Sequence, residues 1–419
     1  MNGLPDESWV DSLVAETQHV ETPQSWQWWS YLCCISAAAG NNYYLTSLKG
    51  DLVYKPNIYV LLLGESGLGK GFPINRAYML SHKADNTRVI KGRSSIQAIV
   101  TELSQTKTVP GKPLITDSRG FIINGELSTA IIADPDALTL LTDLYDGHYN
   151  PEWSNRLKTS GTEKLTNPYI TCLFGSSPAH FYDSVPQANI EGGYIGRNLI
   201  IYEEKRSKDV DLLDEESAEQ TKESEKIRFE SYIAPKYVPH LVAIGQTKGR
   251  IIPSEGARLY FNSWRKEWRA TQAKYNDKTG FINRVPDHML KVAMLISLSR
   301  PNGMLVITER DMEEARDKVT ALVYAAQQTT AGIGLDPLAV QTKFVLNLLI
   351  AASENKLTRK QLLTRGYGNF DAPTLDRIME SLQEMNWVDR QRTFGSNADL
   401  IYHLSGEPLA NLNKFRERK

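Results

Sequence analysis

The stretch Ile58–Arg76, IYVLLLGESGLGKGFPINR, decides the fold predicted for this chain. Ile58–Leu63 is a continuous apolar run, long enough for one buried strand and too short for most helices. Glycines at 64, 67 and 69 then interrupt the run, and Lys70 precedes a segment that can be helical. Strand, glycine loop, lysine and helix follow one another in the order that a phosphate-binding loop requires.

Glycines in such a loop allow backbone N–H groups to surround phosphate oxygens, because no Cβ stands in the way. The helix N-terminus adds partial positive charge, and Lys70 can reach the outer phosphates. At Gly71 the pattern departs from its usual form, since the hydroxyl that normally binds Mg²⁺ is missing. The alternative is an ordinary glycine-rich turn. The predicted nucleotide-binding residues of this loop are Gly64, Glu65, Ser66, Gly67, Leu68, Gly69, Lys70 and Gly71.

Composition sets the general class. The chain has 419 residues, 41% of them hydrophobic, and a formal net charge of −1. Two or three domains are expected at that length, and any nucleic-acid contact must come from local basic patches. Cys33, Cys34 and Cys172 lie in apolar surroundings, which indicates a reduced intracellular protein without a zinc site. The start lacks the features of a signal peptide, and no apolar run is long enough to span a membrane, so we expect a cytoplasmic protein.

Three further apolar runs resemble strands and end or begin at polar residues. Gly120–Asn124 is followed by Gly125 and Glu126. In ATPases with a phosphate-binding loop, a neighbouring strand ends in acids, of which one holds the Mg²⁺ shell and the other polarises the attacking water. Glu126 fits the second role, whereas Gly125 occupies the place of the first. The alternative for Glu126 is a solvated loop charge.

The other two runs add two candidate residues. Tyr169–Phe174 leads to Ser177, a polar residue that can touch the γ-phosphate or can belong to a Ser-Pro turn. Asn198–Tyr202 directly follows Arg197. Between Gly120–Asn124 and Tyr169–Phe174, a segment with turn residues at both ends predicts a hairpin with a polar, mildly basic tip around Lys158 and Lys164.

These segments together resemble a known family. The order of GESGLGKG, FIINGELS, LYDGHYNPEWSNR, CLFGSSPAHF and GGYIGRNLIIY is similar to that of AAA+ helicase-type ATPases of phages, plasmids and mobile islands. Those proteins are related in plan to superfamily 3 and MCM-type helicases and often occur with a primase. The resemblance covers roughly residues 26–328.

The resemblance implies an ATP site made by Lys70, Glu126, Ser177 and Arg197, with Arg197 acting across a subunit boundary. Arg284 resembles the lid-domain arginine of MCM-like ATPases, and its alternative is a surface charge at a helix start. The implied cofactors are ATP and Mg²⁺. The implied assembly is a homo-oligomeric ring, a hexamer in such families, with single-stranded DNA in its central channel. No primase motif is visible, so a priming partner would be a separate chain.

The last part of the chain has a different pattern. Amphipathic helices are expected at Val340–Ser353, Thr358–Thr364 and Ala372–Met385, followed by two strands around residues 395–397. Three helices and a two-stranded wing predict a winged-helix domain. Arg377, Arg390 and Arg392 are its candidate phosphate contacts, and a protein-docking module is the alternative.

The expected fold class is therefore α/β, a P-loop AAA+ core with a helical lid and a C-terminal winged helix. The expected parts are an N-terminal helical segment (1–25), the core (26–205), a linker and lid (206–331), the winged helix (338–406) and a basic tail (407–419). Between the core and the lid helices, Leu241–Ile252 is expected to form short strands. The expected function is that of a ring-forming, ATP-dependent DNA helicase or translocase in replication of a mobile element.

Hydrolysis is the open point of this prediction, because Gly71 and Gly125 replace residues of the usual magnesium shell. Two other functions stay open. One is a nucleotide-binding loader or scaffold that hydrolyses ATP weakly or not at all. The other is an origin-binding protein in which the winged helix dominates.

Overall fold

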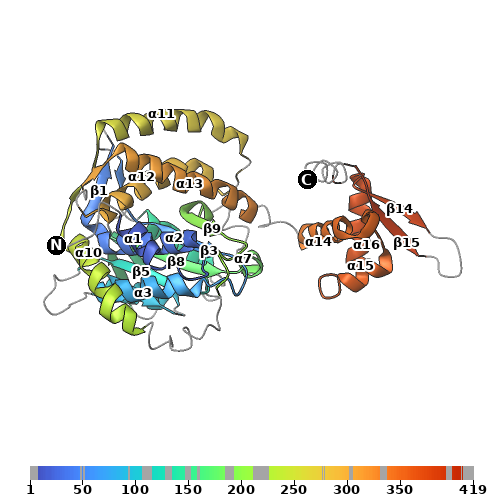
Figure 1. The fold of residues 1–419 in the computed structure, drawn as a ribbon, viewed down its shortest axis with the longest axis horizontal. Coiled ribbons are helices and arrows are strands. Elements are labelled where there is room, and N and C mark those ends of the chain that lie inside the picture. Colours follow the sequence, from blue (N-terminus) through green and yellow to red (C-terminus); the bar gives the residue numbers. More distant parts are fainter. Residues whose placement is uncertain are drawn as a thin grey trace. The chain divides into compact units, whose positions relative to one another are not determined.

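The structure is a computed structural model that describes residues 8–47, 50, 52–92, 95–105, 116–127, 135–146, 152–157, 161–184, 193–210, 226–275, 277, 279–301, 305–330, 337–392, 399–406 and 408. The chain divides into two compact units, residues 1–333 and 334–419. Both mix helices and strands, and each is drawn in Figure 1.

A five-stranded parallel sheet forms the centre of the first unit. Its strand order is β4-β5-β8-β3-β9, and all four pairings are parallel. The strands are β3 (Tyr59–Leu63), β4 (Arg88–Lys91), β5 (Arg119–Asn124), β8 (Tyr169–Ser176) and β9 (Asn198–Tyr202). The mixed α/β class expected from the sequence is therefore confirmed, and β3, β8 and β9 coincide with predicted apolar runs.

Helices cover both faces of this sheet, because side chains alternate between the faces of a strand. Along β3, Val60 and Leu62 belong to one hydrophobic cluster, and Tyr59, Leu61 and Leu63 belong to another. The first cluster includes α1 (Trp9–Glu16), α2 (Gln24–Ala39), α3 (Gly71–Ala84), α10 (Ala234–Gln246), α11 (Glu255–Thr271), α12 (Phe281–Ser299) and α13 (Glu309–Thr330). The second includes α4 (Ile96–Ser104), α6 (Pro135–Tyr145) and α7 (Pro178–Ser184).

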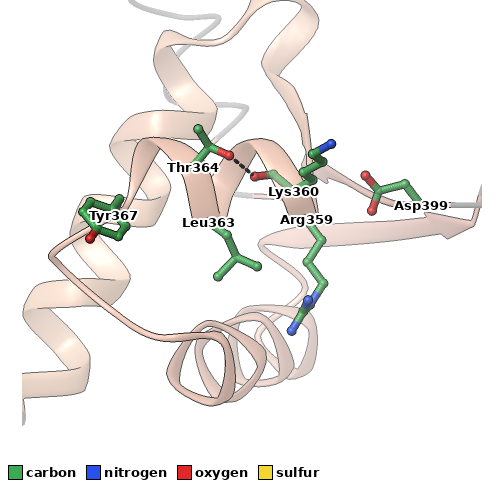
Figure 2. A pocket seen from close by; sticks show the side chains of 6 residues that line it. All are labelled: Arg359, Lys360, Leu363, Thr364, Tyr367 and Asp399. Atoms are coloured by element: carbon green, nitrogen blue, oxygen red, sulfur yellow. Dashed lines mark hydrogen bonds between the residues drawn. The ribbon is translucent and has the colours of Figure 1, made fainter. Parts of the chain in front are cut away.

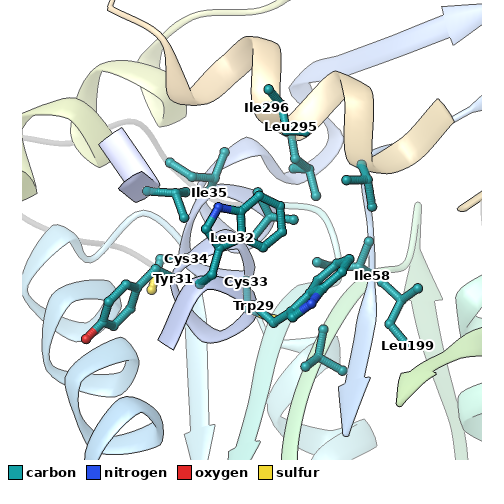
Figure 3. Close-up of a cluster of buried hydrophobic side chains, with 14 of the residues drawn as sticks. Trp29, Tyr31, Leu32, Cys33, Cys34, Ile35, Ile58, Leu199, Leu295 and Ile296 are labelled. Atoms are coloured by element: carbon teal, nitrogen blue, oxygen red, sulfur yellow. The ribbon is translucent and has the colours of Figure 1, made fainter. Parts of the chain in front are cut away.

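Helix α2 occupies the middle of the first cluster. Figure 3 shows its side chains between the strand region around Ile58 and helix α12, which contributes Leu295 and Ile296. The tryptophans of α2 are buried in this cluster, so they serve packing. Helices α12 and α13, which lie in the region expected to form a lid, thus share one core with the sheet.

Smaller pairings complete the first unit. Helix α2 ends at Gly40, whose φ of 52° favours glycine, and β1 (Tyr43–Thr46) then pairs antiparallel with β2 (Val53–Tyr54) and parallel with β10 (Gly249–Arg250). Strands β11 (Ile252–Pro253) and β12 (Val306–Ile307) pair in parallel. The expected hairpin is present as β6 (Glu152–Leu157) and β7 (Gly161–Thr166). Its tip, with Lys158, lies outside the described residues.

The prediction of strand-like pieces over Leu241–Ile252 was wrong for most of that range. Helix α10 continues to Gln246, and only the short strands β10 and the start of β11 follow. Tyr237, Leu241 and Ile244 are buried at helical spacing, so packing of one helical face against the first cluster decides the conformation.

The second unit has three helices and a three-stranded sheet. Its helices are α14 (Pro337–Ala351), α15 (Arg359–Arg365) and α16 (Ala372–Glu384), and its strands are β13 (Lys356–Thr358), β14 (Val388–Arg392) and β15 (Leu400–Leu404). The sheet order is β13-β15-β14, all antiparallel. Thr358 caps α15 in a reciprocal capping box with Gln361. Strand β13 is an addition to the three helices and two strands expected from the sequence.

Candidate nucleotide site

The loop between β3 and α3 requires glycine at three positions. Gly67 and Gly69 have φ of 91° and 89°, in the left-handed region. A Cβ at Gly69 would lie 2.6 Å from the Thr22 hydroxyl oxygen, and one at Gly64 would lie 2.6 Å from the carbonyl oxygen of Glu203. The glycines of the motif are therefore needed to build this turn, which the sequence alone left open.

Lys70 lies at the start of α3 and folds back over the loop. Its Nζ donates to the carbonyl oxygens of Gly64 (2.5 Å) and Glu65 (3.0 Å), and it lies 5.7 Å from the ring centroid of Trp26. Burial lowers the pKa of the Lys70 ammonium, while the charges of Glu126 and Glu65 act in the opposite direction. The lysine is thus a buried cation, and the charge of Glu126, just beyond β5, is the largest of those that favour its charged form.

The carboxyl ends of β5, β8 and β3 meet beside this loop. Gly64 N donates to the carbonyl oxygen of Ser176 (3.3 Å), and Leu127 N donates to that of Gly175 (2.6 Å). Asn124 on β5 pairs with Phe174, and Ser176 on β8 pairs with Leu63. This register places exposed Glu126 at the level where β3 ends.

This edge is also a switch point in the topology. The chain leaves β3 through α3 for β4, at one edge of the sheet, and leaves neighbouring β8 for β9, at the other edge. In open α/β sheets, ligands bind in the crevice outside the carboxyl ends of strands at such a point. The loop, Lys70 and Glu126 are therefore grouped where this sheet is suited to bind a ligand.

Ser177 lies at the same edge but has a structural contact. Its hydroxyl oxygen accepts a hydrogen bond from His180 N (3.3 Å) at the start of α7. The Ser-Pro turn considered for this segment is thus present, since Pro178 begins α7. A hydroxyl that accepts one hydrogen bond keeps its own proton to donate, so the contact leaves a ligand role open.

Arg197 lies at the opposite end of the sheet. It precedes Asn198, which pairs with Tyr59 at the start of β3. Five residue steps of roughly 3.3 Å place it about 17 Å from the loop end of β3. Its guanidinium donates to Asp146 Oδ2 from Nε (3.1 Å) and Nη2 (2.5 Å), and to the Gly193 carbonyl oxygen (2.9 Å). Lys70 and Arg197 of the same chain therefore lie near opposite edges of the sheet.

Arg284 belongs to the same distant edge. Helix α12 begins against the turn before β9, because His288 Nε2 lies 3.0 Å from the Gly196 carbonyl oxygen. The charges of Arg284 and Arg197 both lower the pKa of His288, after burial as the main cause, to about 3. The two arginines predicted for the nucleotide site are thus brought together, away from Lys70 of their own chain.

A pocket of about 320 Å³ lies directly beside the glycine loop. Residues 19–22, which connect α1 to α2, form one wall, and residues 67–69 with Phe72 form another. Arg206 completes it by donating to the Gly67 carbonyl oxygen (3.2 Å) and pairing with Glu21. Mostly apolar walls with a few polar groups at the edge, beside a glycine loop, are suited to accept a flat heteroaromatic ring.

Sequence reasoning missed this pocket. Thr22 donates to the Gly69 carbonyl oxygen (3.2 Å) across 47 residues of sequence, and Arg206 reaches Gly67 across 139. No local pattern encodes such contacts. The sequence signal was Pro23, which predicts a helix start after Thr22. It indicates where the connection between α1 and α2 ends, but not that Thr22 contacts the glycine loop.

The predicted DNA contacts lie in both units. Lys164 is exposed on β7, and Arg377, Arg390 and Arg392 are exposed on α16 and β14. Every second residue of β14 lies on the same face of the small sheet, so Arg390 and Arg392 share a face with Val388. Val388 belongs to the hydrophobic core of this unit. Lys158 lies outside the described residues.

Comparison with known proteins adds no relative: no protein-family model matches the chain, and no curated protein is significantly similar to it. Among the helices that the structure describes, none is long and apolar enough to cross a membrane. The same part of the chain contains no group of three or more His, Cys, Asp or Glu side chains that could bind a metal ion.

Proposed function

We propose that this chain binds ATP through a P-loop of AAA+ type, hydrolyses it slowly in a ring of identical subunits, and uses it to translocate along or unwind DNA. The observation that carries the proposal is the grouping of the Gly64–Lys70 loop with Glu126 at the switch point of a parallel sheet. Glycines with left-handed φ, a lysine and a strand-end acid at one edge are what phosphoryl transfer needs from a protein.

The roles of the residues follow from their chemistry. Lys70 exchanges its two loop carbonyl contacts for the outer phosphate oxygens, which are stronger acceptors because they are charged. Glu126, exposed and ionisable, orients a water for in-line attack. The pocket beside the loop, with Phe72 and Thr22, accepts the base.

Magnesium would be held at this site by the nucleotide phosphates and water rather than by side chains of the chain. Neither Gly71 nor Gly125 offers a ligand, and Mg²⁺ commonly keeps several waters and binds mainly to substrate phosphates. When bound, it would neutralise charge that develops on the phosphates. The protein's share of that neutralisation would rest on Lys70 and on Arg197 of a neighbouring subunit.

The separation of Arg197 and Arg284 from Lys70 supports assembly. A complete site would contain the loop and Glu126 of one subunit and the two arginines of the next. An arginine supplied in this way contributes roughly 10³-fold or more to turnover in related phosphoryl-transfer sites. Hydrolysis is then a property of the oligomer, which we propose to be a hexameric ring.

Contact with DNA is assigned to two elements. The hairpin β6–β7, with Lys158 and Lys164, is proposed to project into the central channel of the ring. The second unit is proposed to be a winged helix, in which α14, α15 and α16 precede the wing β14–β15 and exposed Arg390 and Arg392 contact phosphates. Replication of a phage or other mobile element, with a separate primase, is the setting that the family resemblance implies.

A second function has a specific observation in its favour. Both positions that normally complete the magnesium shell are glycines, at the end of β5 and at the start of α3. A nucleotide-binding scaffold or DNA loader would keep the loop and lose these residues. In that case ATP is a structural ligand.

One set of measurements tests the proposal. Calorimetry should show ATP binding by the wild-type chain and strong weakening by Lys70→Ala; unchanged affinity contradicts the whole proposal. ATPase assays with and without single-stranded DNA, beside sedimentation with ATP, separate the two functions. A ring that binds ATP and DNA but hydrolyses no faster than its Glu126→Gln variant is the scaffold.

A further inference from the structure

Basic and acidic side chains are separated within the second unit. The segment Lys356–Tyr367 contains Lys356, Arg359, Lys360 and Arg365 and no acidic residue. The segment Asp371–Glu384, which includes α16, contains four acidic residues, Asp371, Asp376, Glu380 and Glu384, against the single basic Arg377. Lys356 pairs with Glu354 and Arg359 with Asp376, so Lys360 and Arg365 are the basic residues of the first segment that remain to attract a polyanion, while α16 carries a net negative charge.

A pocket of about 680 Å³ lies on the basic side. Figure 2 shows Arg359, Lys360, Leu363 and Thr364 from α15 along it, with Tyr367 in the turn that follows and Asp399 directly before β15. Lys360, Thr364 and Tyr367 recur at intervals of four and three residues, which keeps them on one side of the helix and its continuation. The Thr364 hydroxyl donates to the Lys360 carbonyl oxygen (2.9 Å).

Tyr367 contributes almost nothing to the packing of this unit. It is 90% exposed, although the glycines on both sides of it are each required by the conformation of the turn. A Cβ at Gly366 would lie 2.1 Å from the Phe370 ring, and Gly368 has φ of 87°. The fold thus explains the two glycines but gives no reason for an aromatic ring between them. An exposed aromatic beside basic residues is the arrangement on which unpaired bases stack.

The three charged residues that line the pocket, Arg359, Lys360 and Asp399, would act differently on a bound phosphate. Arg359 is fixed by a bidentate pair with Asp376 (2.8 Å for both contacts), which offsets most of its charge, so Lys360 is the cation of this pocket that can attract a phosphate. Lys360 is exposed on the next position of the helix. Asp399 accepts a hydrogen bond from Leu400 N (2.8 Å), and its carboxylate repels phosphates from that end.

We infer that α15 and the Tyr367 turn form a binding site for single-stranded nucleic acid, with a base stacked on Tyr367 and the adjoining phosphate on Lys360. The inference deepens the nucleic-acid part of the proposed function and does not depend on ATP hydrolysis. It also separates this contact from α16, the helix that bears Arg377.

The test uses the full chain without nucleotide and the fluorescence anisotropy of labelled oligothymidine. Tyr367→Ala should weaken binding about fivefold or more, because stacking on one aromatic contributes strongly to affinity. Tyr367→Phe, which keeps the ring, should bind like wild type. Lys360→Ala should weaken binding and reduce the salt slope by about one. Tyr367 and Lys360 are exposed, so these changes leave the core intact.

Two matched controls complete the design. Tyr324→Ala removes a tyrosine that is 70% exposed on α13 in the other unit and should not alter affinity. Arg377→Ala removes an exposed charge on α16 and tests the alternative contact there; it should weaken binding less than Lys360→Ala. If Arg377→Ala weakens binding while Tyr367→Ala and Lys360→Ala do not, α16 is the contact and the inference is wrong, although the proposed function stands. If the wild-type chain binds no single-stranded DNA, this inference and the DNA-binding part of the proposed function are both wrong. Calorimetry with ATP then tests the nucleotide-binding part by itself.

A strand without bases tests the stacking step. An abasic oligonucleotide of the same length should bind the wild-type chain more weakly than oligothymidine and bind the Tyr367→Ala variant as tightly as oligothymidine does. Equal affinity of the wild-type chain for both strands would overturn the stacking of a base on Tyr367. Competition by polyglutamate as effective as by oligothymidine would point instead to an acidic protein partner.

Discussion

Arg197 is held by Asp146 of its own chain, with Nη2 2.5 Å and Nε 3.1 Å from the same carboxylate oxygen. The arginine side chain is 12% exposed and the aspartate 33%. The ring centroid of Tyr145 lies 5.9 Å from the guanidinium carbon. The arginine proposed to complete a neighbour's site is therefore positioned by its own subunit before any neighbour is present.

The first prediction follows from this pair. Asp146→Asn removes the charge that orients Arg197, so ATP hydrolysis by the assembled protein should fall while ATP affinity stays unchanged. The uncompensated cationic cluster should also cost about 1–2 kcal/mol of unfolding free energy, a value reduced for the partial exposure of the pair. ATPase assays, calorimetry and urea unfolding measure the three quantities. Asp143→Asn, at an exposed position of α6, which ends directly before Asp146, is the matched control and should leave all three unchanged.

The second prediction concerns acid stability. Burial, followed by the charges of Lys291, Arg284 and Arg197, lowers the pKa of His288 to about 3. The unfolded chain takes up this proton near pH 6.5 and the folded chain does not, so stability is lost as pH falls from about 6.5 toward about 3. Between pH 7 and pH 5 the loss should be about 2 kcal/mol.

Urea unfolding of the nucleotide-free protein at both pH values tests this dependence. His288→Gln should reduce the difference between the two pH values, whereas the exposed His82→Gln should not. Asp287 acts in the opposite direction at lower pH, because burial raises its carboxyl pKa, so the comparison should stop at pH 5. An unchanged pH dependence in His288→Gln would assign the acid sensitivity to other groups.

Local pattern was sufficient for the elements that build the site. The apolar runs gave the buried strands, and the Gly64–Lys70 spacing identified the turn between β3 and α3. The failure at α10 has a physical reason: Pro239 and Gly245 lower helix propensity, whereas burial of Tyr237, Leu241 and Ile244 on one face outweighs it.

Contacts between distant segments could not be predicted in the same way. The partner of Arg197, Asp146, lies 51 residues away in the sequence. Thr22 donates to the glycine loop across 47 residues of sequence. Such pairs depend on the strand order of the sheet, because β9 is placed beside β3 although three other strands of the sheet lie between them in sequence. The different charges of α15 and α16 are visible in the sequence. Whether these charged side chains could bind a ligand depends on which face of each helix is exposed, and only the structure gives that.

The third prediction uses the two unusual glycines. A Cβ at Gly71 or at Gly125 would meet no atom within 4 Å, so each site has room for a side chain. Gly71→Ser restores a hydroxyl and Gly125→Asp a carboxylate toward Mg²⁺. Each should lower the Mg²⁺ concentration needed for ATP binding and raise the hydrolysis rate. Gly69→Ala is the control: its Cβ would lie 2.6 Å from the Thr22 hydroxyl and its φ is 89°, so ATP binding should be lost.

Magnesium titrations of ATP affinity and steady-state ATPase rates check these variants. If Gly71→Ser and Gly125→Asp bind ATP as the wild type does and gain neither Mg²⁺ affinity nor turnover, the two positions do not face the metal. The assignment of Glu126 to the attacking water would then lose its geometric basis.

The last prediction separates a motor from a scaffold. Glu126 lies at the carboxyl edge of the sheet and Arg197 at the amino edge, so the site that we propose would take one from each of two subunits. Glu126→Gln and Arg197→Ala should each stop hydrolysis and leave ATP binding and ring assembly intact. Mixed in equal amounts, the two variants should recover part of the activity, because some interfaces then join an intact Glu126 to an intact Arg197.

The controls for this mixing experiment fix its interpretation. Arg197→Ala mixed with Lys70→Ala should also recover activity, since Lys70 and Glu126 belong to the same half of the site, whereas Glu126→Gln mixed with Lys70→Ala should recover none. ATPase rates at matched total protein, with sedimentation to confirm mixed rings, measure each combination. Recovery in the last mixture, or in none, contradicts a site shared between the two edges of the sheet; Arg197 would then act only through Asp146, as part of the fold of its own subunit.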